Sequence, residues 1–530
     1  MSSFSSSSSK TGESISRRDA LKCLGAAIAA SAVSAPSSAS SASELAASAA
    51  SSGTLPKRPN ILWITGEGVP QHALSCYGSR LIETPNIDRI AKEGVRFENA
   101  FTTNGLCAPS RATLLTGTYT HINGMIGNPD VGDIPEDERP HFDPAQQTFV
   151  KIFKRNGYQT GMVGKWHLPV NPAQTGFDYF VYKNGAGGPY YDPTGYLGNP
   201  HLGSDEIQKF RYEGYETDVM TDLAIKGMQQ FTQPFLMMVQ YFNAHRPFDP
   251  PHKYEHLYDS VSIPEPGTFW DDYSYRASPA RTARMRIEDM PDFNPPADLT
   301  DRQRRQWNYQ RFMEHFLGTL RSQDDNIGRI FEFLEKNGLA ENTIVVYTTD
   351  HGFFLGDHGW FDKRFMYEQA IRVPWMIRCP GLGNQGSVRS DWVINIDNAP
   401  TVLDLAGLPI PPEMQGRSIL PVLLGKAPVE DDPAFYYHYY EFGSPHWVAP
   451  HYGIRTKRYK LISYYERNEW EFFDLEKDPD EMESLFIDNG RRIQPGYESI
   501  LQDMVVRLKQ IRETYKDTTG RPVNLELLGD

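Results

Sequence analysis

The chain has 530 residues, of which 39% are hydrophobic and 23% are charged, as in ordinary globular proteins. Its formal net charge of -14 argues against nucleic acid as the main partner, because phosphate backbones bind basic surfaces. An anionic substrate is not excluded, since a local pocket of Arg and Lys can override the overall field. The body lacks an uninterrupted apolar run of about 18 residues, so the sequence predicts no transmembrane segment.

The first 55 residues are rich in Ser and Ala and are set aside from the fold. Within them the pair Arg17-Arg18 precedes an apolar run at residues 23–33, which small residues follow. This order resembles a Tat-type export signal and predicts a periplasmic or extracellular protein. The alternative interpretation is a low-complexity tail with a chance Arg pair.

The folded body begins near Lys57 with a short apolar run at residues 61–65, typical of a buried parallel strand. Thr84-Pro85 then suits the start of a helix. Residues 235–242 and 343–349 are further buried-strand candidates, and an amphipathic pattern at residues 304–334 predicts a long helix between them. Strands alternating with helices predict an α/β fold with a mostly parallel sheet sandwiched by helices.

After about residue 412 the sequence becomes rich in aromatic residues. The segments at residues 436–440, 452–465 and 470–475 are separated by turn residues and predict a small antiparallel sheet. A closing helix at residues 497–515 should pack against it. We therefore expect three parts: residues 1–55, a larger domain at residues 56–412 and a C-terminal subdomain at residues 413–530.

The most informative segment is Cys-Ala-Pro-Ser-Arg at residues 107–111, followed by Ala-Thr-Leu-Leu-Thr-Gly. Pro109 suits the first turn of a helix and Gly117 suits its C-terminal cap. Cys107 is thus expected just before a helix N-terminus, where free N–H groups favour an anion and acidify a thiol. An ordinary cysteine enzyme is one interpretation. The extended pattern, however, is similar to the signature of the sulfatase family, in which this Cys is oxidised to formylglycine after translation.

The resemblance extends over residues 58–485. Gly-Lys-Trp-His-Leu at residues 164–168 and Asn-Ala-His-Arg-Pro at residues 243–247 are similar to further family motifs, as are residues 349–352 and 362–368. One Lys or His in a loop is usually a solvated surface group, but five segments in family order need another explanation. The resemblance implies an alkaline phosphatase-like fold, hydrolysis of sulfuric esters and maturation by a formylglycine-generating enzyme.

The resemblance also implies a metal site. Asp350 follows the strand at residues 343–349 and Glu67 follows the strand at residues 61–65, so both should lie at the carboxyl edge of the sheet. Asp350 and His351 are implied as metal ligands, together with Glu67 and the formylglycine made from Cys107. The implied ion is calcium, which prefers oxygen ligands.

The pair Glu67-Gly68 departs from the family pattern, which usually has two consecutive Asp residues here. Glu67 keeps a carboxylate, whereas Gly68 offers no side chain. The cation could therefore be bound more weakly, completed by water or replaced by another metal. One alternative function is thus a catalytically impaired carbohydrate-binding protein. The other is a phosphodiesterase or phosphonate hydrolase of the same superfamily.

The family mechanism, carried over, gives each catalytic candidate a role. One hydroxyl of the hydrated formylglycine would attack sulfur, and the second would then expel sulfate. Arg111 would hold the formylglycine, while Lys165 and Lys363 would bind the sulfate. His245, with Lys363, would protonate the leaving oxygen, and His167 would act as the base that collapses the hemiacetal.

The segments at residues 353–368 and 437–441 look most like the branch that contains N-acetylglucosamine-6-sulfatases and their bacterial relatives. This likeness implies a sulfated carbohydrate as the substrate. The substrate-recognition candidates are Arg364, His446, His451 and Arg455. Aromatic and His side chains in a small sheet are about as often packing residues, and bacterial members of this branch also act on algal polysaccharides, so the sugar stays open.

Overall fold

The computed structural model describes residues 14–15, 55–129, 139–185, 187–198, 207–426, 430–443 and 445–523. Arg17, Arg18 and the apolar run after them lie outside these residues, so the structure does not test the export prediction. Within the described ranges, no helix is both long enough and apolar enough to cross a membrane.

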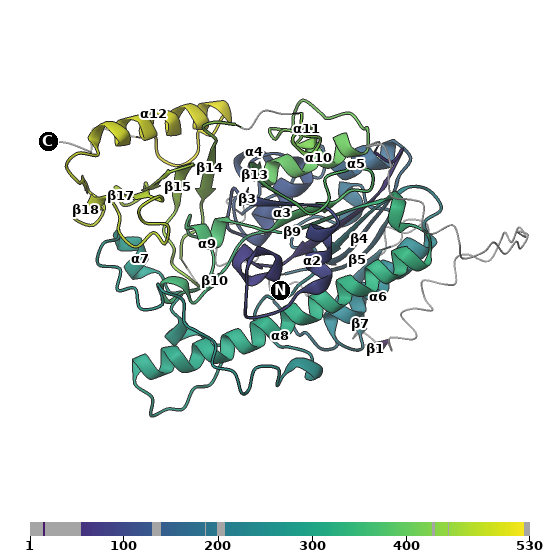
Figure 1. The fold of residues 1–530 in the computed structure, drawn as a ribbon, viewed down its shortest axis with the longest axis horizontal. Coiled ribbons are helices and arrows are strands. Elements are labelled where there is room, and N and C mark those ends of the chain that lie inside the picture. Colours follow the sequence, from purple (N-terminus) through teal and green to yellow (C-terminus); the bar gives the residue numbers. More distant parts are fainter. Residues whose placement is uncertain are drawn as a thin grey trace, which may run out of the picture.

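An eleven-stranded sheet forms the centre of the molecule (Figure 1). Its central strands β4, β8, β2 and β9 run parallel, and β12 is antiparallel to both of its neighbours. The mostly parallel α/β fold is therefore confirmed. In spatial order the strands are β1 (Ser14–Ile15), β7 (Gln208–Tyr212), β6 (Thr194–Gly198), β5 (Tyr179–Lys183), β4 (Gln159–Lys165), β8 (Phe235–Gln240), β2 (Asn60–Gly66), β9 (Thr343–Thr349), β12 (Trp375–Arg378), β3 (Val95–Phe101) and β13 (Ser387–Ile394).

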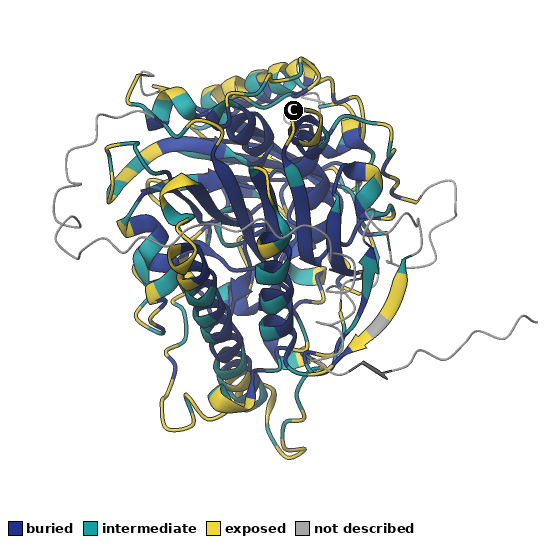
Figure 2. Ribbon diagram, turned by 90° about the vertical axis from the view of Figure 1, so that its right-hand side faces the viewer, coloured by how far each residue is buried: buried dark blue, intermediate teal, exposed yellow. Residues whose placement is uncertain are grey.

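Helices cover both faces of this sheet, because alternate side chains of each strand face opposite cores. Leu62 and Ile64 of β2 pack in the core beneath α2, α6 and α8, whereas Ile61 and Trp63 pack beneath α3, α5 and α10. Figure 2 shows the buried strands between helices whose outer sides are exposed. The helices are α2 (Pro85–Lys92), α3 (Cys107–Thr116), α4 (Thr120–Asn123), α5 (Phe149–Arg155), α6 (Glu216–Gln230), α7 (Ser278–Thr282), α8 (Asp301–Lys336), α9 (Glu368–Ile371), α10 (Asn398–Leu405), α11 (Leu420–Leu423) and α12 (Glu498–Thr514).

The predicted ends of several elements are confirmed. Pro85 is the first residue of α2 and β9 has its predicted bounds. The long helix α8 starts three residues earlier than expected, because Thr300 caps it by accepting a hydrogen bond from the backbone N–H of Gln303. Strand β8 ends at Gln240, two residues short of the expectation.

The second sheet is antiparallel, as predicted for the C-terminal region. It consists of β14 (Ala434–Tyr439), β15 (His451–Thr456), β16 (Tyr459–Tyr464) and β17 (Glu469–Asp474), with α12 against one face. Its other face packs on Phe365 and Tyr367. This contact fixes the chain two residues beyond Lys363. Two short antiparallel pairs complete the strands: β10 (Phe354–Leu355) with β11 (Phe361–Asp362), and β18 (Phe486–Ile487) with β19 (Arg492–Ile493).

Candidate active site

Polar side chains converge at the carboxyl edge of the four central parallel strands. Glu67 follows β2, Lys165 ends β4, Gln240 ends β8 and Asp350 follows β9. Because these neighbouring strands end at one edge of the sheet, they bring together residues up to 283 positions apart in the sequence. All four side chains are buried.

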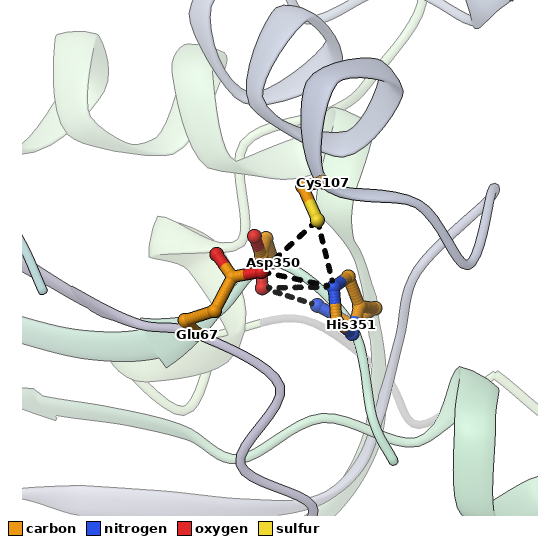
Figure 3. A group of neighbouring side chains, drawn as sticks. All are labelled: Glu67, Cys107, Asp350 and His351. Atoms are coloured by element: carbon orange, nitrogen blue, oxygen red, sulfur yellow. Dashed lines mark hydrogen bonds and ion pairs between the residues drawn. The ribbon is translucent and has the colours of Figure 1, made fainter. Parts of the chain in front are cut away.

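Helix α3 brings Cys107 to this edge. Cys107 is the first helical residue, a correction to the expectation that it lies just before the helix, whereas Gly117 caps the helix with φ 66° as predicted. The Cys107 side chain is 1% exposed. Its Sγ lies 3.0 Å from Oε1 of Glu67 and 3.4 Å from Nε2 of His351 (Figure 3).

The Arg111 guanidinium, one helical turn further along α3, binds both carboxylates. Its Nη2 lies 2.7 Å from Oε2 of Glu67 and 3.0 Å from Oδ2 of Asp350. Its Nη1 donates to the Lys165 carbonyl at 2.9 Å and to Oε1 of Gln240 at 2.5 Å. Arg111 thus uses one oxygen of each carboxylate and leaves Oε1 of Glu67 and Oδ1 of Asp350 for other partners.

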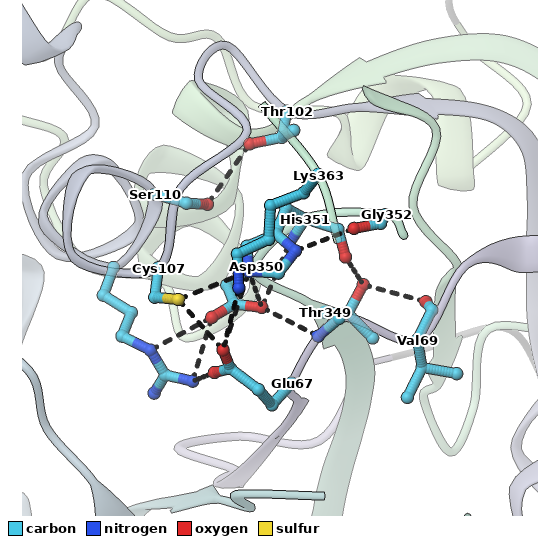
Figure 4. A network of polar contacts seen from close by, with 12 residues as sticks. Glu67, Val69, Thr102, Cys107, Ser110, Thr349, Asp350, His351, Gly352 and Lys363 are labelled. Carbon is cyan, nitrogen blue, oxygen red and sulfur yellow. Dashed lines mark hydrogen bonds and ion pairs between the residues drawn. The ribbon is translucent and has the colours of Figure 1, made fainter. Parts of the chain in front are cut away.

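Lys363 and His351 approach these carboxylate oxygens (Figure 4), and so does Lys165. Nζ of Lys165 lies 2.8 Å from Oε1 of Glu67, and Nζ of Lys363 lies 3.9 Å from the same oxygen. Nδ1 of His351 lies 2.7 Å from the Gly352 carbonyl, which leaves Nε2 facing the cluster. This Nε2 lies 3.6 Å from Oε1 of Glu67 and 3.5 Å from Oδ1 of Asp350.

Charges in this cluster determine the protonation of its acids. Burial raises the pKa of Glu67, but Lys165, His351, Arg111 and Lys363 hold it well below its usual value. Burial and Glu67 raise the pKa of Cys107, but Lys165, Lys363 and His351 lower it by more. The pKa of the thiol therefore lies well below its usual value. Burial and the adjacent Glu67 raise the pKa of Asp350 to about 6.

The donor set fits a divalent cation. One ligand atom each from Glu67, Cys107, Asp350 and His351 lie within 4.8 Å of one another, and all four residues are buried. Burial and then the neighbouring Glu67 carboxylate raise the pKa of Asp350, and a cation between the two carboxylates would relieve their repulsion. The structure thus brings these four predicted positions together.

The space beside Gly68 is occupied by the side chains of His351 and Phe353. An added Cβ at this position would lie 3.1 Å from Cε1 of His351 and 3.0 Å from Cδ2 of Phe353. Its φ of 59° also lies in the left-handed region that side chains rarely adopt. The Gly68 N–H donates to Oδ1 of Asp350 at 3.2 Å. The absence of a side chain at position 68 therefore leaves room for the His351 imidazole next to the cluster.

The remaining catalytic candidates line the same site. His245 is 9% exposed, and its Nδ1 lies 3.0 Å from the Arg246 carbonyl. Burial and then Lys165 lower the pKa of His245 to about 4. His167 is fully buried just past the end of β4. Burial raises the pKa of the nearby Glu441, and Arg364 and, to a smaller extent, His167 oppose this rise.

Two of the four substrate-recognition candidates lie beside Lys363. Arg364 pairs with Oδ1 of Asp362, and its Nε is 4.0 Å from Oε2 of Glu441. Nε2 of His446 lies 3.2 Å from Oδ2 of Asp362. Asp362 therefore holds both candidates. Burial raises the pKa of this carboxyl, but Arg364 and His446 lower it by more, so it stays well below its usual value.

The other two candidates are not brought to the cluster. His451 is fully buried among aromatic rings, including those of Tyr437 and Tyr439, and its Nδ1 binds the Ala449 carbonyl. Nη2 of Arg455 lies 3.1 Å from Oε2 of Glu368. Packing within the small sheet, the alternative noted for aromatic and His residues, accounts for His451, whereas Arg455 is held by the Glu368 carboxylate.

Sequence reasoning missed several residues that shape the site. Gln240 binds Arg111, and its position at the end of a buried parallel strand is the signal that could have identified it. Asn128 accepts a hydrogen bond from the Ala108 N–H at 3.2 Å and donates its own N–H to Glu441 at 2.6 Å. Neither Asn128 nor Glu441 has a local sequence signal for this role.

Comparison with known proteins decides the family. The sulfatase family profile matches residues 59–408, and a profile described as N-sulphoglucosamine sulphohydrolase, C-terminal, matches residues 356–514. The chain belongs to the sulfatase family. It is therefore a sulfuric ester hydrolase by descent, and neither alternative function is favoured.

Individual relatives agree with this assignment. The chain is 38% identical over 513 residues to an N-acetylglucosamine-6-O-sulfatase of Bacteroides thetaiotaomicron, and the aligned region covers 87% of each chain. It is 26% identical to an arylsulfatase of Clostridium perfringens over 87% of this chain and 96% of that one. A solved structure of a protein in complex with its substrate D-glucosamine-2-N,6-O-disulfate is 37% identical, with a TM-score of 0.79 over 87% of this chain and 99% of the other.

We predict that Gly68→Asp lowers sulfate release instead of raising it. The new side chain would displace the His351 imidazole, and the backbone at position 68 would become strained by about 1–2 kcal/mol. Steady-state rates and thermal unfolding of the purified variant would measure both effects. Gly407→Asp is the matched control, because its φ is 67° and no heavy atom lies within 4 Å of an added Cβ. A Gly68→Asp variant faster than the parent would show that the site lacks a ligand there.

Proposed function

We propose that this sulfatase removes the 6-O-sulfate of N-acetylglucosamine residues in a carbohydrate, through a formylglycine formed from Cys107. The observation that carries the proposal is the buried Cys107 side chain among Arg111, Lys165 and Lys363, beside a cluster of metal-ligand type. The relative with 38% identity and the solved complex with a 6-O-sulfated glucosamine support the choice of sugar.

Different residues of this chain have different roles in the proposed reaction. The formylglycine, once formed, supplies the nucleophilic oxygen at position 107. Arg111 fixes the carboxylates around it, and the Lys165 and Lys363 ammonium groups lie where they can stabilise charge on the sulfuryl oxygens. The proposed maturation requires a formylglycine-generating enzyme in the host.

We propose calcium as the resident cation, held by Glu67, Asp350, His351 and the side chain at position 107. When bound it would neutralise sulfuryl charge next to the nucleophile. Arg111 occupies one oxygen of each carboxylate, so each can offer the cation its other oxygen.

Proton transfer is assigned to His245, Lys363 and His167. His245 is neutral at pH 7 in the substrate-free site, because burial and Lys165 lower its pKa to about 4. A negatively charged sulfate ester next to the imidazole would raise that pKa, so that His245 with Lys363 can deliver a proton to the leaving oxygen. His167 is the proposed base for the second half of the reaction.

Arg364 and His446 are proposed to contact the sugar, since Asp362 holds both beside Lys363. His446 belongs to residues 413–530, which we propose as the subdomain that completes the substrate pocket. His451 and Arg455 are not part of this proposal, because their surroundings keep them away from the cluster.

Substitution of the nucleophile tests the chemistry. Cys107→Ala should lower sulfate release by at least about a thousandfold, because no other side chain can form the aldehyde. Ion chromatography of released sulfate would measure it, on protein whose modification at position 107 is verified by mass spectrometry. Cys379→Ala is the control, because Cys379 is also buried but lies in the core under α10. Full turnover by Cys107→Ala would contradict the assigned nucleophile.

Regioisomers test the proposed substrate. With N-acetylglucosamine sulfated at O3, O4 or O6, we expect sulfate release from the 6-isomer alone, because the pocket must present a primary ester to position 107. Equal rates on all isomers, or release from another isomer only, would contradict the choice of substrate while leaving the sulfatase chemistry standing.

Export is proposed from the N-terminal sequence. Replacing both Arg17 and Arg18 by Lys should leave the protein in the cytoplasm, because twin-arginine receptors recognise the arginine pair. Fractionation followed by immunoblotting would show its location, with Lys22→Arg as a control that changes a nearby basic residue only. Normal export of the double Lys variant would contradict the proposal.

A further inference from the structure

Two aromatic side chains are exposed on the segment between β14 and β15. Phe442 is 56% exposed and Trp447 is 38% exposed. Their rings touch edge to face, with centroids 5.7 Å apart. Adjacent exposed aromatic rings leave apolar area in water, which is unfavourable unless a ligand covers it.

One end of this segment is tied to the catalytic helix. The N–H of Ala108, the residue after Cys107, donates to Oδ1 of Asn128 at 3.2 Å. The N–H of Asn128 donates to Oε1 of Glu441 at 2.6 Å. Two hydrogen bonds therefore connect the residue beside the nucleophile to the residue beside Phe442.

The other end is tied to the residues around Lys363. Nε2 of His446 lies 3.2 Å from Oδ2 of Asp362, and Asp362 precedes Lys363 in the chain. Nδ1 of His446 lies 3.0 Å from the Arg284 carbonyl, and the His446 carbonyl accepts from the Arg284 N–H at 2.7 Å. Trp447 follows directly, so its backbone position is fixed from the catalytic side.

A cation lies against this aromatic pair. The Arg284 guanidinium is 5.0 Å from the centre of the Trp447 ring, and Arg284 is exposed. Among the described residues, no carboxylate forms a salt bridge with Arg284. The surface thus combines two aromatic rings with an exposed guanidinium, and hydrogen bonds and ion pairs connect its backbone to the residues around Cys107 and Lys363.

We propose that Phe442, Trp447 and Arg284 form a second sugar subsite, which binds an anionic pyranose unit linked to the sulfated glucosamine. This inference rests on the proposed function and extends it: the preferred substrate is an acidic oligosaccharide, which binds more tightly than the free monosaccharide. The C–H face of a pyranose packs on an aromatic ring, and Arg284 can pair with a carboxylate or sulfate on the same unit.

The test compares two substrates and a double variant. The substrates are 6-sulfated N-acetylglucosamine and a disaccharide in which a uronate is attached to it. For the wild-type enzyme KM should be about tenfold lower on the disaccharide, because we expect one stacked and ion-paired sugar unit to tighten binding by roughly that factor. The Phe442→Ala/Trp447→Ala variant should lose this difference, with kcat unchanged and the monosaccharide unaffected.

Further variants separate stacking from folding. Phe442→Tyr/Trp447→Phe keeps aromatic faces and should keep the low KM. Arg284→Ala should raise KM on the uronate-containing disaccharide, and its effect should shrink at high salt. Val506→Ala, at an exposed apolar position on α12 (47% exposed), is the control and should change neither substrate.

Two results would overturn the subsite. The first is an equal KM for both substrates in the wild-type enzyme, and the second is an equal loss on both substrates in the double alanine variant. If the wild-type enzyme cleaves neither substrate, the proposed function fails separately. Calorimetric titration with the disaccharide then decides the subsite: weaker binding by the double alanine variant supports it, and unchanged binding overturns it.

Discussion

The buried Arg111 guanidinium is the constraint on which the site depends. It is 2% exposed, and an unpaired charge at that depth would be strongly destabilising. Its hydrogen bonds to Glu67, Lys165, Gln240 and Asp350 join α3 to the ends of β2, β4, β8 and β9. The same contacts orient the two carboxylates, so one interaction both closes the edge of the sheet and arranges the ligands next to Cys107.

This arrangement accounts for the glycine at position 68, where the family pattern usually has Asp. A side chain at position 68 would compete with His351 and Phe353 for space. The imidazole, held through Nδ1 by the Gly352 carbonyl, faces the cluster with Nε2. His351 thus offers a nitrogen donor, and the site keeps four convergent ligand positions without a side chain at position 68. Loss of one ligand side chain is therefore no evidence of lost function.

Much of the fold and site could be predicted from the sequence, and the limits have physical causes. Strands β2 and β9 are continuous apolar runs, and the residues after them must meet at one edge, so Glu67 and Asp350 were predictable. Contacts between distant segments were not: Asn128 and Glu441 are 313 positions apart and pair through a backbone N–H. The burial of His451 and Arg455 was not predictable either, because it depends on how the small sheet packs against Phe101 and Phe365.

The metal content of the purified protein tests the central claim most directly, which is that Gly68 leaves a working ligand cluster. Elemental analysis by mass spectrometry should find about one divalent ion per chain in the wild type. The ion should be lost from Asp350→Asn, and chelation should lower the melting temperature of the wild type but not of that variant. A wild-type protein without bound metal after addition of calcium, or an Asp350→Asn variant with an equal metal content, would contradict the account.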